Sequence, residues 1–288
     1  MILKLQNEKL TVSVNTLGAE IISVIGTDGF EYIWNGEHWS GHAPLLFPVC
    51  GSLLDNKYSF GGKEYSMAKH GFARRSEFEV KELSDTRAVL SLSASEATRA
   101  IYPFEFTLTA EYSIQGNRLS AVFTVKNCGE GVMPFAFGWH PAFNLGGEGD
   151  IEGFYVDFGC DGPLVMHPLA NGPFLSGEEI TFPLSDGAYR LNEKQIYEND
   201  TLILTGSAGS ARLYGFGDIH EVTLSWSDNL PYLCIWKWPD STARYLCLEP
   251  WTNVAADGIT PENFDTRVMQ RLGGGESASY EYTVDFQK

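Results

Sequence analysis

Alternation of apolar and polar residues with a period of two is the feature that most constrains how this chain can fold. Between residues 104 and 114 every second residue is apolar, and the same alternation resumes between residues 119 and 125. Because successive side chains of a strand point to opposite faces, each run predicts a strand with one buried face. The intervening Gln115-Gly116-Asn117 is typical of a turn. The two runs therefore predict a long β-hairpin.

Shorter runs of the same kind recur along the rest of the chain. Residues 55–67 predict a small hairpin that turns at Gly61-Gly62, and further strands are expected at residues 10–14, 20–26, 88–93, 201–205, 222–226, 232–236, 245–248 and 280–286. Helical periodicity is almost absent. One short helix is expected after Thr260-Pro261-Glu262, with threonine as the cap and proline at the first helical position. Many strands joined by turns predict an all-β protein, either an antiparallel sandwich or a barrel.

Composition favours one folded domain. The chain has 288 residues, of which 43% are hydrophobic, and this is enough to build a large core. No linker, low-complexity segment or repeat of fixed period interrupts the sequence. Since all-β domains often reach about 250 residues, a single domain over residues 1–288 is expected.

The charge balance argues against nucleic acid and membranes as partners. The chain has 20 basic and 37 acidic residues, a net charge of −17, and such a field repels phosphate backbones and anionic lipids. The first residues, MILKLQNEKL, meet Lys4 before any apolar run develops, so no signal peptide is expected. No uncharged apolar stretch approaches the roughly 20 residues that a bilayer requires. We expect a soluble, cytoplasmic protein.

The five cysteines are typical of a protein in a reducing compartment. Their number is odd and no Cys-x-x-Cys pair occurs, which argues against a disulfide framework and against a zinc ribbon. They lie mainly in apolar, strand-like surroundings, where core thiols are more common than nucleophiles. No GxSxG motif and no P-loop motif is present either.

Two histidines lie where glycine and proline fix the backbone. His70 begins the segment HGFAR, and His140 lies in GWHPAFN. Glycine and proline at these positions predict that the imidazole lies at a strand end or in a rigid loop. There it can take part in catalysis or be hydrogen-bonded to backbone groups. His38 and His42 have the spacing of helical zinc ligands. However, Ser40-Gly41 disfavours a helix and no third ligand is evident, so no metal site is expected.

Glu249 is the leading carboxylate candidate, because it ends an apolar strand in the segment CLEPW. A carboxylate between apolar neighbours costs free energy unless it is hydrogen-bonded or has a raised pKa, and a raised pKa suits a general base near neutral pH. A structural ion pair is the competing interpretation. Trp251 offers a flat face to a sugar ring. Asp200 could accept hydrogen bonds from sugar hydroxyls, or could be a solvated turn residue.

Seven short segments, spread over nearly the whole chain, match the motifs of one known family and follow one another in the same order as in that family. They are LGAEIISV at 17–24, YIWN at 32–35, PLLFP at 44–48, HGFAR at 70–74, GWHPAFN at 138–144, ENDTLIL at 198–204 and CLEPW at 247–251. In this set the chain resembles the aldose 1-epimerase (galactose mutarotase) family, and more narrowly its bacterial branch close to the hexose-6-phosphate mutarotases. The resemblance implies a large antiparallel β-sandwich, called a supersandwich. It also implies a sugar cleft on the concave face of one sheet, and no metal or organic cofactor.

The resemblance implies roles for individual residues. Glu249 matches the family's catalytic base, His140 its catalytic acid, and His70 a residue that contacts the sugar near the ring oxygen. Asp200 matches the substrate-binding aspartate. The remaining substrate-binding candidates are Arg74, Trp251 and Trp34.

The implied activity is that of an isomerase that interconverts the α and β anomers of an aldohexose. One proton leaves the anomeric hydroxyl and another reaches the ring oxygen. The ring opens, the aldehyde rotates about C1–C2, and the ring closes on its other face. Glu249 as base and charged His140 as acid meet this demand and exchange roles on closure, while His70 could stabilise charge on the ring oxygen. The expected partner is a small sugar, an aldohexose or a hexose phosphate, and the chain is expected to be a monomer or homodimer.

One position departs from the family. Ser52 stands where relatives usually carry an arginine that helps to bind the sugar or its phosphate. The cations Lys69, Arg74 and Arg75 could compensate and hold a sugar phosphate, or could be solvated charges. A hexose-6-phosphate mutarotase and a non-catalytic carbohydrate-binding protein on the same fold therefore stay open. A glycoside hydrolase or polysaccharide lyase is disfavoured, because it normally needs a pair of carboxylates and only one is well supported.

Overall fold

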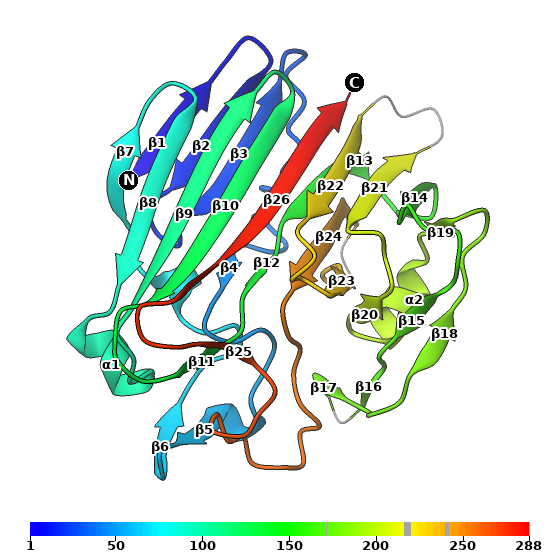
Figure 1. Ribbon diagram of the computed structural model, residues 1–288. Coiled ribbons are helices and arrows are strands. Elements are labelled where there is room, and N and C mark those ends of the chain that lie inside the picture. The colour runs from blue at the N-terminus through cyan, green and yellow to red at the C-terminus, as the bar shows by residue number, and fades with distance from the viewer. Residues whose placement is uncertain (171, 216–219, 240–241, 288) are drawn as a thin grey trace.

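The computed structural model describes residues 1–170, 172–215, 220–239 and 242–287. Two large antiparallel sheets dominate this part of the chain, so the expected all-β sandwich is confirmed (Figure 1). None of the described helices is long and apolar enough to cross a membrane.

The larger sheet has nine strands and carries the long hairpin. Its strand order is β19-β14-β21-β22-β26-β10-β9-β8-β7. In chain order its strands are β7 (Glu79–Leu83), β8 (Arg87–Ser93), β9 (Phe106–Gln115), β10 (Arg118–Asn127), β14 (Phe154–Asp157), β19 (Ala188–Arg190), β21 (Ser210–Gly215), β22 (Glu221–Trp226) and β26 (Ser277–Gln287).

The predicted hairpin is confirmed in both its strands and its turn. Buried and partly exposed residues alternate along β9 and along most of β10. The two strands pair from Gln115 opposite Arg118 to Phe106 opposite Asn127. Gly116, with φ +57°, supplies the left-handed conformation that so tight a turn requires. The alternation therefore buries one face of this sheet along the hairpin.

The second sheet has eight strands and is built around β24 (Ala243–Trp251). β24 pairs with β23 on one side and with β12 and β13 on the other, and its last seven residues are all buried. A polar side chain on this strand is therefore held rigidly and away from bulk water. The other strands are β4 (Leu45–Leu46), β12 (Gly138–Trp139), β13 (Ala142–Glu148), β15 (Leu164–Met166), β18 (Ile180–Phe182), β20 (Leu202–Thr205) and β23 (Tyr232–Trp236).

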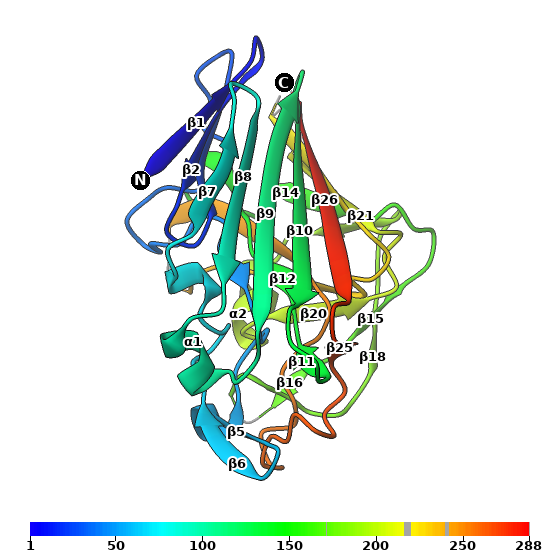
Figure 2. The same ribbon diagram turned by 60° about the vertical axis from the view of Figure 1, so that its left-hand side comes forward.

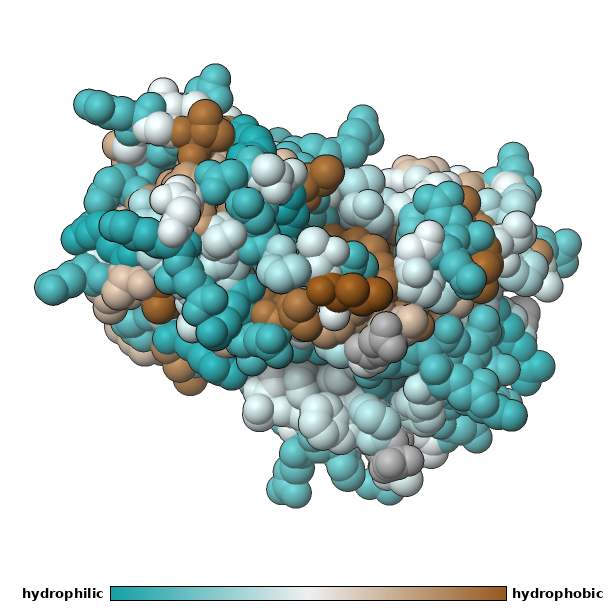
Figure 3. Space-filling view, turned by 90° about the horizontal axis from the view of Figure 1, so that it is seen from below, coloured by the Kyte–Doolittle hydropathy of each residue, from teal (hydrophilic) through white to brown (hydrophobic). Residues whose placement is uncertain are grey.

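Smaller elements extend the sandwich. A three-stranded sheet lies beside the large one, and short hairpins and the helix α1 lie toward the lower end (Figure 1). Seen from below, this end is largely hydrophilic, with a band of apolar side chains across its middle (Figure 3). The elements are β1 (Ile2–Gln6), β2 (Leu10–Asn15), β3 (Glu20–Gly26), β5 (Lys57–Phe60), β6 (Lys63–Ser66), β11 (Met133–Phe135), β16 (Leu169–Ala170), β17 (Phe174–Leu175), β25 (Gln270–Leu272), α1 (Glu96–Ile101), α2 (Glu193–Glu198) and the 3-10 turns η1 (Leu54–Asn56) and η2 (Ala73–Arg75).

Aromatic side chains join the two large sheets. Phe123 of β10 and Tyr282 of β26 both lie against Trp139 of β12, with ring centroids 6.1 and 5.3 Å apart. The Tyr282 hydroxyl also donates a hydrogen bond to the carbonyl of Pro250 in β24, at 3.1 Å. In the turned view β9, β10 and β26 form one layer in front of the second sheet (Figure 2). These contacts fix β12 and β24 against the large sheet. His140, directly after β12, and Glu249 and Trp251 of β24 line the candidate site.

The prediction of a helix after Thr260-Pro261-Glu262 is wrong. The Ser59 amide donates to the Glu262 carbonyl at 2.8 Å, and the Phe264 amide donates to the Ser59 carbonyl at 2.9 Å. Because these backbone groups pair with β5, they are not available for helical hydrogen bonds. The segment instead forms turns and an isolated bridge.

The helices α1 and α2 were not predicted from the sequence, because each has only six residues. Ser95 caps α1 and accepts a hydrogen bond from the Thr98 amide, while Asn192 caps α2 and accepts one from the Gln195 amide. Helices this short leave less than two turns of periodicity for a pattern to show. The capping residues Ser95 and Asn192 were the sequence signal from which these helices could have been predicted.

Gly71 sets how closely the segment after His70 approaches β4. A Cβ added to Gly71 would lie 2.2 Å from the Phe47 carbonyl oxygen, and Gly71 has φ +70°. Both features exclude any larger residue.

We therefore expect Gly71→Ala to destabilise the protein far more than Gly61→Ala. Gly61 also has a positive φ, +56°, but a Cβ there meets nothing within 4 Å. The left-handed conformation alone should cost about 1–2 kcal/mol in the free energy of unfolding, and the backbone clash at Gly71 should add to it. Urea unfolding of both variants measures the difference, and equal losses would contradict the close approach.

Candidate active site

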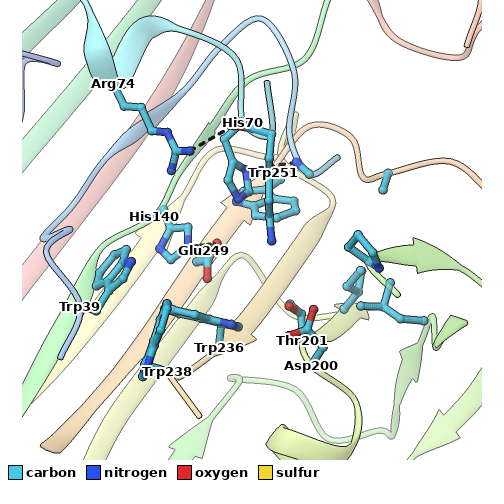
Figure 4. Close-up of a pocket in the computed structure, with 16 residues that line it drawn as sticks. Trp39, His70, Arg74, His140, Asp200, Thr201, Trp236, Trp238, Glu249 and Trp251 are labelled. Atoms are coloured by element: carbon cyan, nitrogen blue, oxygen red, sulfur yellow. Dashed lines mark hydrogen bonds and ion pairs between the residues drawn. The ribbon is translucent and has the colours of Figure 1, made fainter. Parts of the chain in front are cut away.

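One cavity, of about 180 Å³, gathers most of the residues that the sequence singled out. It is lined by β20, β23, β24 and by segments around residues 39, 51, 70, 140, 170 and 255. Six of the seven predicted site residues line it (Figure 4): His70, Arg74, His140, Asp200, Glu249 and Trp251. Chain segments far apart in the sequence therefore converge on one site.

Glu249 and His140 form a buried pair at the back of the cavity. Glu249 projects from β24 and is 1% exposed, while His140, directly after β12, is 7% exposed. The imidazole Nε2 lies 3.2 Å from a Glu249 carboxyl oxygen. Trp39 stacks on the imidazole with ring centroids 5.1 Å apart. The pair is thus held in direct contact, with its exposed edge toward the cavity (Figure 4).

Burial shifts both members of this pair toward their uncharged forms. It raises the pKa of Glu249 well above its ordinary 4.5, although the charge of Lys69 opposes the shift. It lowers the pKa of His140 to about 3, helped by the charges of Lys69 and Arg74. The implied mechanism needs a charged His140 and an ionised Glu249 when the ring opens, and it does not say which forms the resting site holds. The structure favours a protonated Glu249 beside a neutral His140.

His70 lies beside the pair, with its ring centroid 5.8 Å from that of His140, and it is hydrogen-bonded to Gly51. Its backbone amide donates to the Gly51 carbonyl at 2.9 Å, and the Gly51 amide donates to the His70 Nδ1 at 3.1 Å. Since Nδ1 accepts, the neutral ring carries its hydrogen on Nε2. Burial, followed by the charges of His140, Lys69 and Arg74, lowers the His70 pKa well below its ordinary 6.5. His70 is therefore a neutral hydrogen-bond donor at neutral pH.

Two cations stand at the edge of the cavity. Arg74 lies in η2 and donates a hydrogen bond to the Lys69 carbonyl at 3.1 Å. The Arg74 side chain is partly buried, and its Nε has no hydrogen-bond partner among the described residues. Arg75 does not line the cavity, so among the described residues the cations of its lining are Lys69 and Arg74.

Tryptophans form much of the remaining wall, and the sequence analysis identified only one of them. Trp39, Trp236 and Trp238 line the cavity together with Trp251. Trp236 ends β23 and Trp238 follows two residues later. A spacing of two would place both side chains on one face of a continued strand, and it could have been read from the sequence. Trp34 does not line the cavity. It lies behind Trp39, to whose carbonyl its indole NH donates at 3.0 Å.

Asp200 and Thr201 stand across the cavity from the Glu249–His140 pair (Figure 4). They follow α2, and Asp200 has φ +58°, so this corner of the wall has a strained backbone. α2 is tied to the tryptophan wall by Lys237, which lies between Trp236 and Trp238. The buried Lys237 ammonium lies 2.8 Å from the Tyr197 hydroxyl and 3.1 Å from the Glu193 carboxylate.

Several buried polar atoms of the lining have no hydrogen-bond partner among the described residues. They are Nε of Arg74, Nδ1 of His140, both carboxyl oxygens of Glu249 and the indole nitrogen of Trp251. A buried polar group without a partner costs about 1–3 kcal/mol, so such groups gather where a polar ligand completes them. The cavity is therefore suited to a small ligand with several hydroxyl groups.

Ser52, His38 and His42 were also discussed in the sequence analysis. Ser52, where an arginine was expected, is itself buried and does not line the cavity, although Gly51 does. Among the described residues His38 and His42 belong to no group of three metal-ligating side chains, whereas His140, Cys247 and Glu249 do form one.

Comparison with known proteins identifies the family. The model of the aldose 1-epimerase family matches residues 1–260. The plasmid protein LacX of Lactococcus lactis is 36% identical, in an alignment that covers 88% of this chain and 89% of LacX. The chain belongs to the aldose 1-epimerase family.

Solved structures agree with this assignment. A galactose mutarotase related enzyme of Lactobacillus acidophilus matches with a TM-score of 0.93 at 28% identity, over 100% of this chain and 98% of that one. A galactose mutarotase-like protein of Lactobacillus casei matches with a TM-score of 0.94 at 29% identity, over the full length of both chains. The supersandwich implied by the sequence is thus confirmed.

Glu249→Gln should stabilise the fold at alkaline pH. Since the folded protein binds the Glu249 proton more tightly than the unfolded chain does, wild-type stability falls as pH rises from about 4.5 to the raised folded pKa. Glutamine does not titrate. The variant should gain about 1.4 kcal/mol over wild type for each pH unit of that window, and little at pH 4.

Urea unfolding at pH 4 and pH 8 measures this gain. Glu8→Gln, at an exposed position, is the matched control and should show no such dependence on pH. A Glu249→Gln variant whose advantage does not grow between the two pH values would show that burial does not raise this pKa.

Proposed function

We propose that this member of the aldose 1-epimerase family is a mutarotase that interconverts the α and β anomers of an aldohexose. The observation that carries the proposal is the buried Glu249–His140 pair, in contact at 3.2 Å and open to a cavity of unpartnered polar atoms. A pyranose offers hydroxyl and ring oxygens to those atoms, and C–H faces to the tryptophans.

The ring-opening step uses the one proton that the pair holds. Glu249 as carboxylate takes the proton of the anomeric hydroxyl, and His140 as imidazolium gives its proton to the ring oxygen. The C1–O5 bond breaks and the aldehyde C=O forms. Glu249 ends protonated and His140 neutral, so the pair still holds one proton. After rotation about C1–C2, the reverse transfers close the ring on its other face.

Burial strengthens each group in its role. A raised pKa makes the Glu249 carboxylate a stronger base, and a low pKa makes the His140 imidazolium a stronger acid. Once the Glu249 carboxyl and the His140 Nε2, 3.2 Å apart, align as a hydrogen bond, transfer of the proton from Glu249 to His140 prepares the reactive ion pair. Ring opening then returns the pair to the uncharged forms that burial favours.

The remaining wall residues position the sugar. The Nε2–H of His70 is a neutral donor, suited to the developing charge on the ring oxygen. Trp251 and Trp39 present aromatic surface to the C–H groups of the ring. Asp200, on the opposite wall, accepts hydrogen bonds from hydroxyl groups remote from C1.

A phosphorylated aldohexose is the second candidate substrate. Lys69 and Arg74 both line the cavity, and the Arg74 Nε has no hydrogen-bond partner among the described residues. A guanidinium and an ammonium together suit a phosphate. Lys69 and Arg74 also supply positive charge from another segment, in place of the arginine that relatives usually carry at the position of Ser52.

Glu249→Gln should lower catalysed anomer exchange by about 10²–10⁴-fold, since it removes the general base. Exchange between α- and β-glucose is followed at equilibrium by NMR with purified protein. His140→Asn should have a similar effect.

The control is Glu281→Gln, at an exposed position of the large sheet. Wild-type exchange rates in Glu249→Gln would remove this residue from the mechanism. If wild-type protein binds sugars, as shown by chemical-shift changes, but accelerates no exchange, the non-catalytic carbohydrate-binding alternative would replace the mutarotase.

Arg74→Met should raise the KM for glucose 6-phosphate by about 10–100-fold, the loss expected for a hydrogen bond to a charged group. The KM for glucose should change much less. Arg75→Met is the matched control, because Arg75 is the adjacent exposed cation and does not line the cavity. Equal effects of Arg74→Met on the two sugars would favour the unphosphorylated substrate.

A further inference from the structure

Three buried side chains at the back of the cavity have the composition of a metal-binding site. His140, Cys247 and Glu249 each offer one ligand atom, and these atoms all lie within 4.8 Å of one another. Cys247 and Glu249 are two residues apart on β24, so both project from the same face of the strand. His140 reaches them from the end of β12, which pairs with β24 through Gly138 and Trp251.

The set of donor atoms suits Zn²⁺. Zinc is bound by thiolate sulfur, imidazole nitrogen and carboxylate oxygen, and a site with three protein ligands keeps a fourth position open. Zinc bonds of about 2.0–2.3 Å put neighbouring tetrahedral ligand atoms about 3.3–3.8 Å apart, so these side chains need to move by only about 1 Å. A thiolate, a carboxylate and a neutral imidazole also cancel the charge of Zn²⁺, which lowers the cost of burying the ion.

The same group is reachable from the cavity. Glu249 and His140 line the cavity, and both Glu249 oxygens are buried without a hydrogen-bond partner among the described residues. An ion in the cavity would meet these two ligands first. Cys247 does not line the cavity and lies behind them, while the fourth position faces the space that a sugar would fill.

We propose that His140, Cys247 and Glu249 form an inhibitory Zn²⁺ site at the centre of the active site. The inhibitory part rests on the proposed function, whereas the binding part does not. Binding displaces two protons, one from the Cys247 thiol and one from the Glu249–His140 pair. Zinc then occupies the lone pairs that the proton transfers use, and its open position competes with the sugar.

Lys69 and Arg74 are the cations that face the site, because both line the same cavity. They oppose a free divalent cation. They have little effect on the complete site, since the ion with its thiolate and carboxylate ligands carries no net charge. Zinc without the Cys247 thiolate would keep a positive charge beside them. The thiol therefore decides whether the ion binds.

Cobalt and zinc titrations test the binding directly. Co²⁺ is added to the metal-free protein, and thiolate ligation is read from the sulfur-to-cobalt charge-transfer absorption in the near ultraviolet. Zn²⁺ affinity is measured by calorimetry in two buffers of different ionisation enthalpy, which also counts the protons released. We expect the charge-transfer band, one zinc per chain and about two protons released.

Cys247→Ala should remove the charge-transfer band and weaken Zn²⁺ binding by about 100-fold or more, since even the loss of an outer-shell partner costs about 10–100-fold. Cys234→Ala is the matched control. Cys234 is an equally buried thiol that lies opposite Glu249 in the register of β23 and β24 and is not part of the three-residue group. Cys247→Ser serves as a second variant if the alanine variant does not fold.

The inhibition is tested by measuring anomer exchange with and without Zn²⁺. Zn²⁺ should inhibit the wild type competitively with sugar, and Cys247→Ala should keep its exchange activity and resist inhibition. Absence of the charge-transfer band, or equal Zn²⁺ affinity in both cysteine variants, would overturn the site. Zinc binding to Cys247 that leaves exchange unchanged would overturn the inhibition. A wild type without exchange activity would refute the proposed function, while the titrations would still decide the metal site.

Discussion

The burial of an acid–base pair in the middle of a sheet is the constraint on which the rest of this site depends. Glu249 occupies the strand that pairs on both sides, where seven successive residues are buried. Sheet pairing holds its backbone, and His140 is held by the short strand β12. The pair therefore cannot relax into water. Burial raises the pKa of Glu249 and lowers the pKa of His140, so each group is shifted toward its uncharged form.

This constraint costs stability and serves chemistry. Unpartnered polar atoms in a buried wall weaken a fold, and such atoms are commonly kept where function needs them. The surrounding structure supplies the rigidity that offsets this cost. Aromatic contacts of Trp139 with Phe123 and Tyr282 lock β12 against the large sheet. The Lys237 contacts with α2 hold the opposite wall. The geometry of the cavity is thus set in part by residues that do not line it.

Much of the fold was readable from the sequence because its strands alternate. The hairpin of β9 and β10 shows period two over its full length, and every expected strand overlaps an observed one. The helix expected near Thr260 failed because a local cap signal could not reveal that Ser59 pairs with that segment. The helices α1 and α2 were missed because six residues are too few to show a period.

The site was partly predictable for a different reason. The segments around His70, His140 and Glu249 resemble family motifs, so their residues could be named without knowing their distances. Trp39 lies outside those motifs, and only the fold brings it to the cavity. The protonation of the Glu249–His140 pair depends on burial, which no local pattern contains. Trp34 belongs to a matching segment and yet lies behind the wall.

The central claim is that the buried pair opens the ring at C1–O5 and leaves the C1–O1 bond intact. Glucose labelled with ¹⁸O at O1 tests this most directly, since ¹³C NMR of C1 reports both the anomer and the oxygen isotope. The account predicts many rounds of protein-catalysed anomer exchange while the label stays on C1. Loss of the label in step with anomer exchange would contradict it, because the C1–O1 bond would then be the one that breaks, as in a glycoside hydrolase.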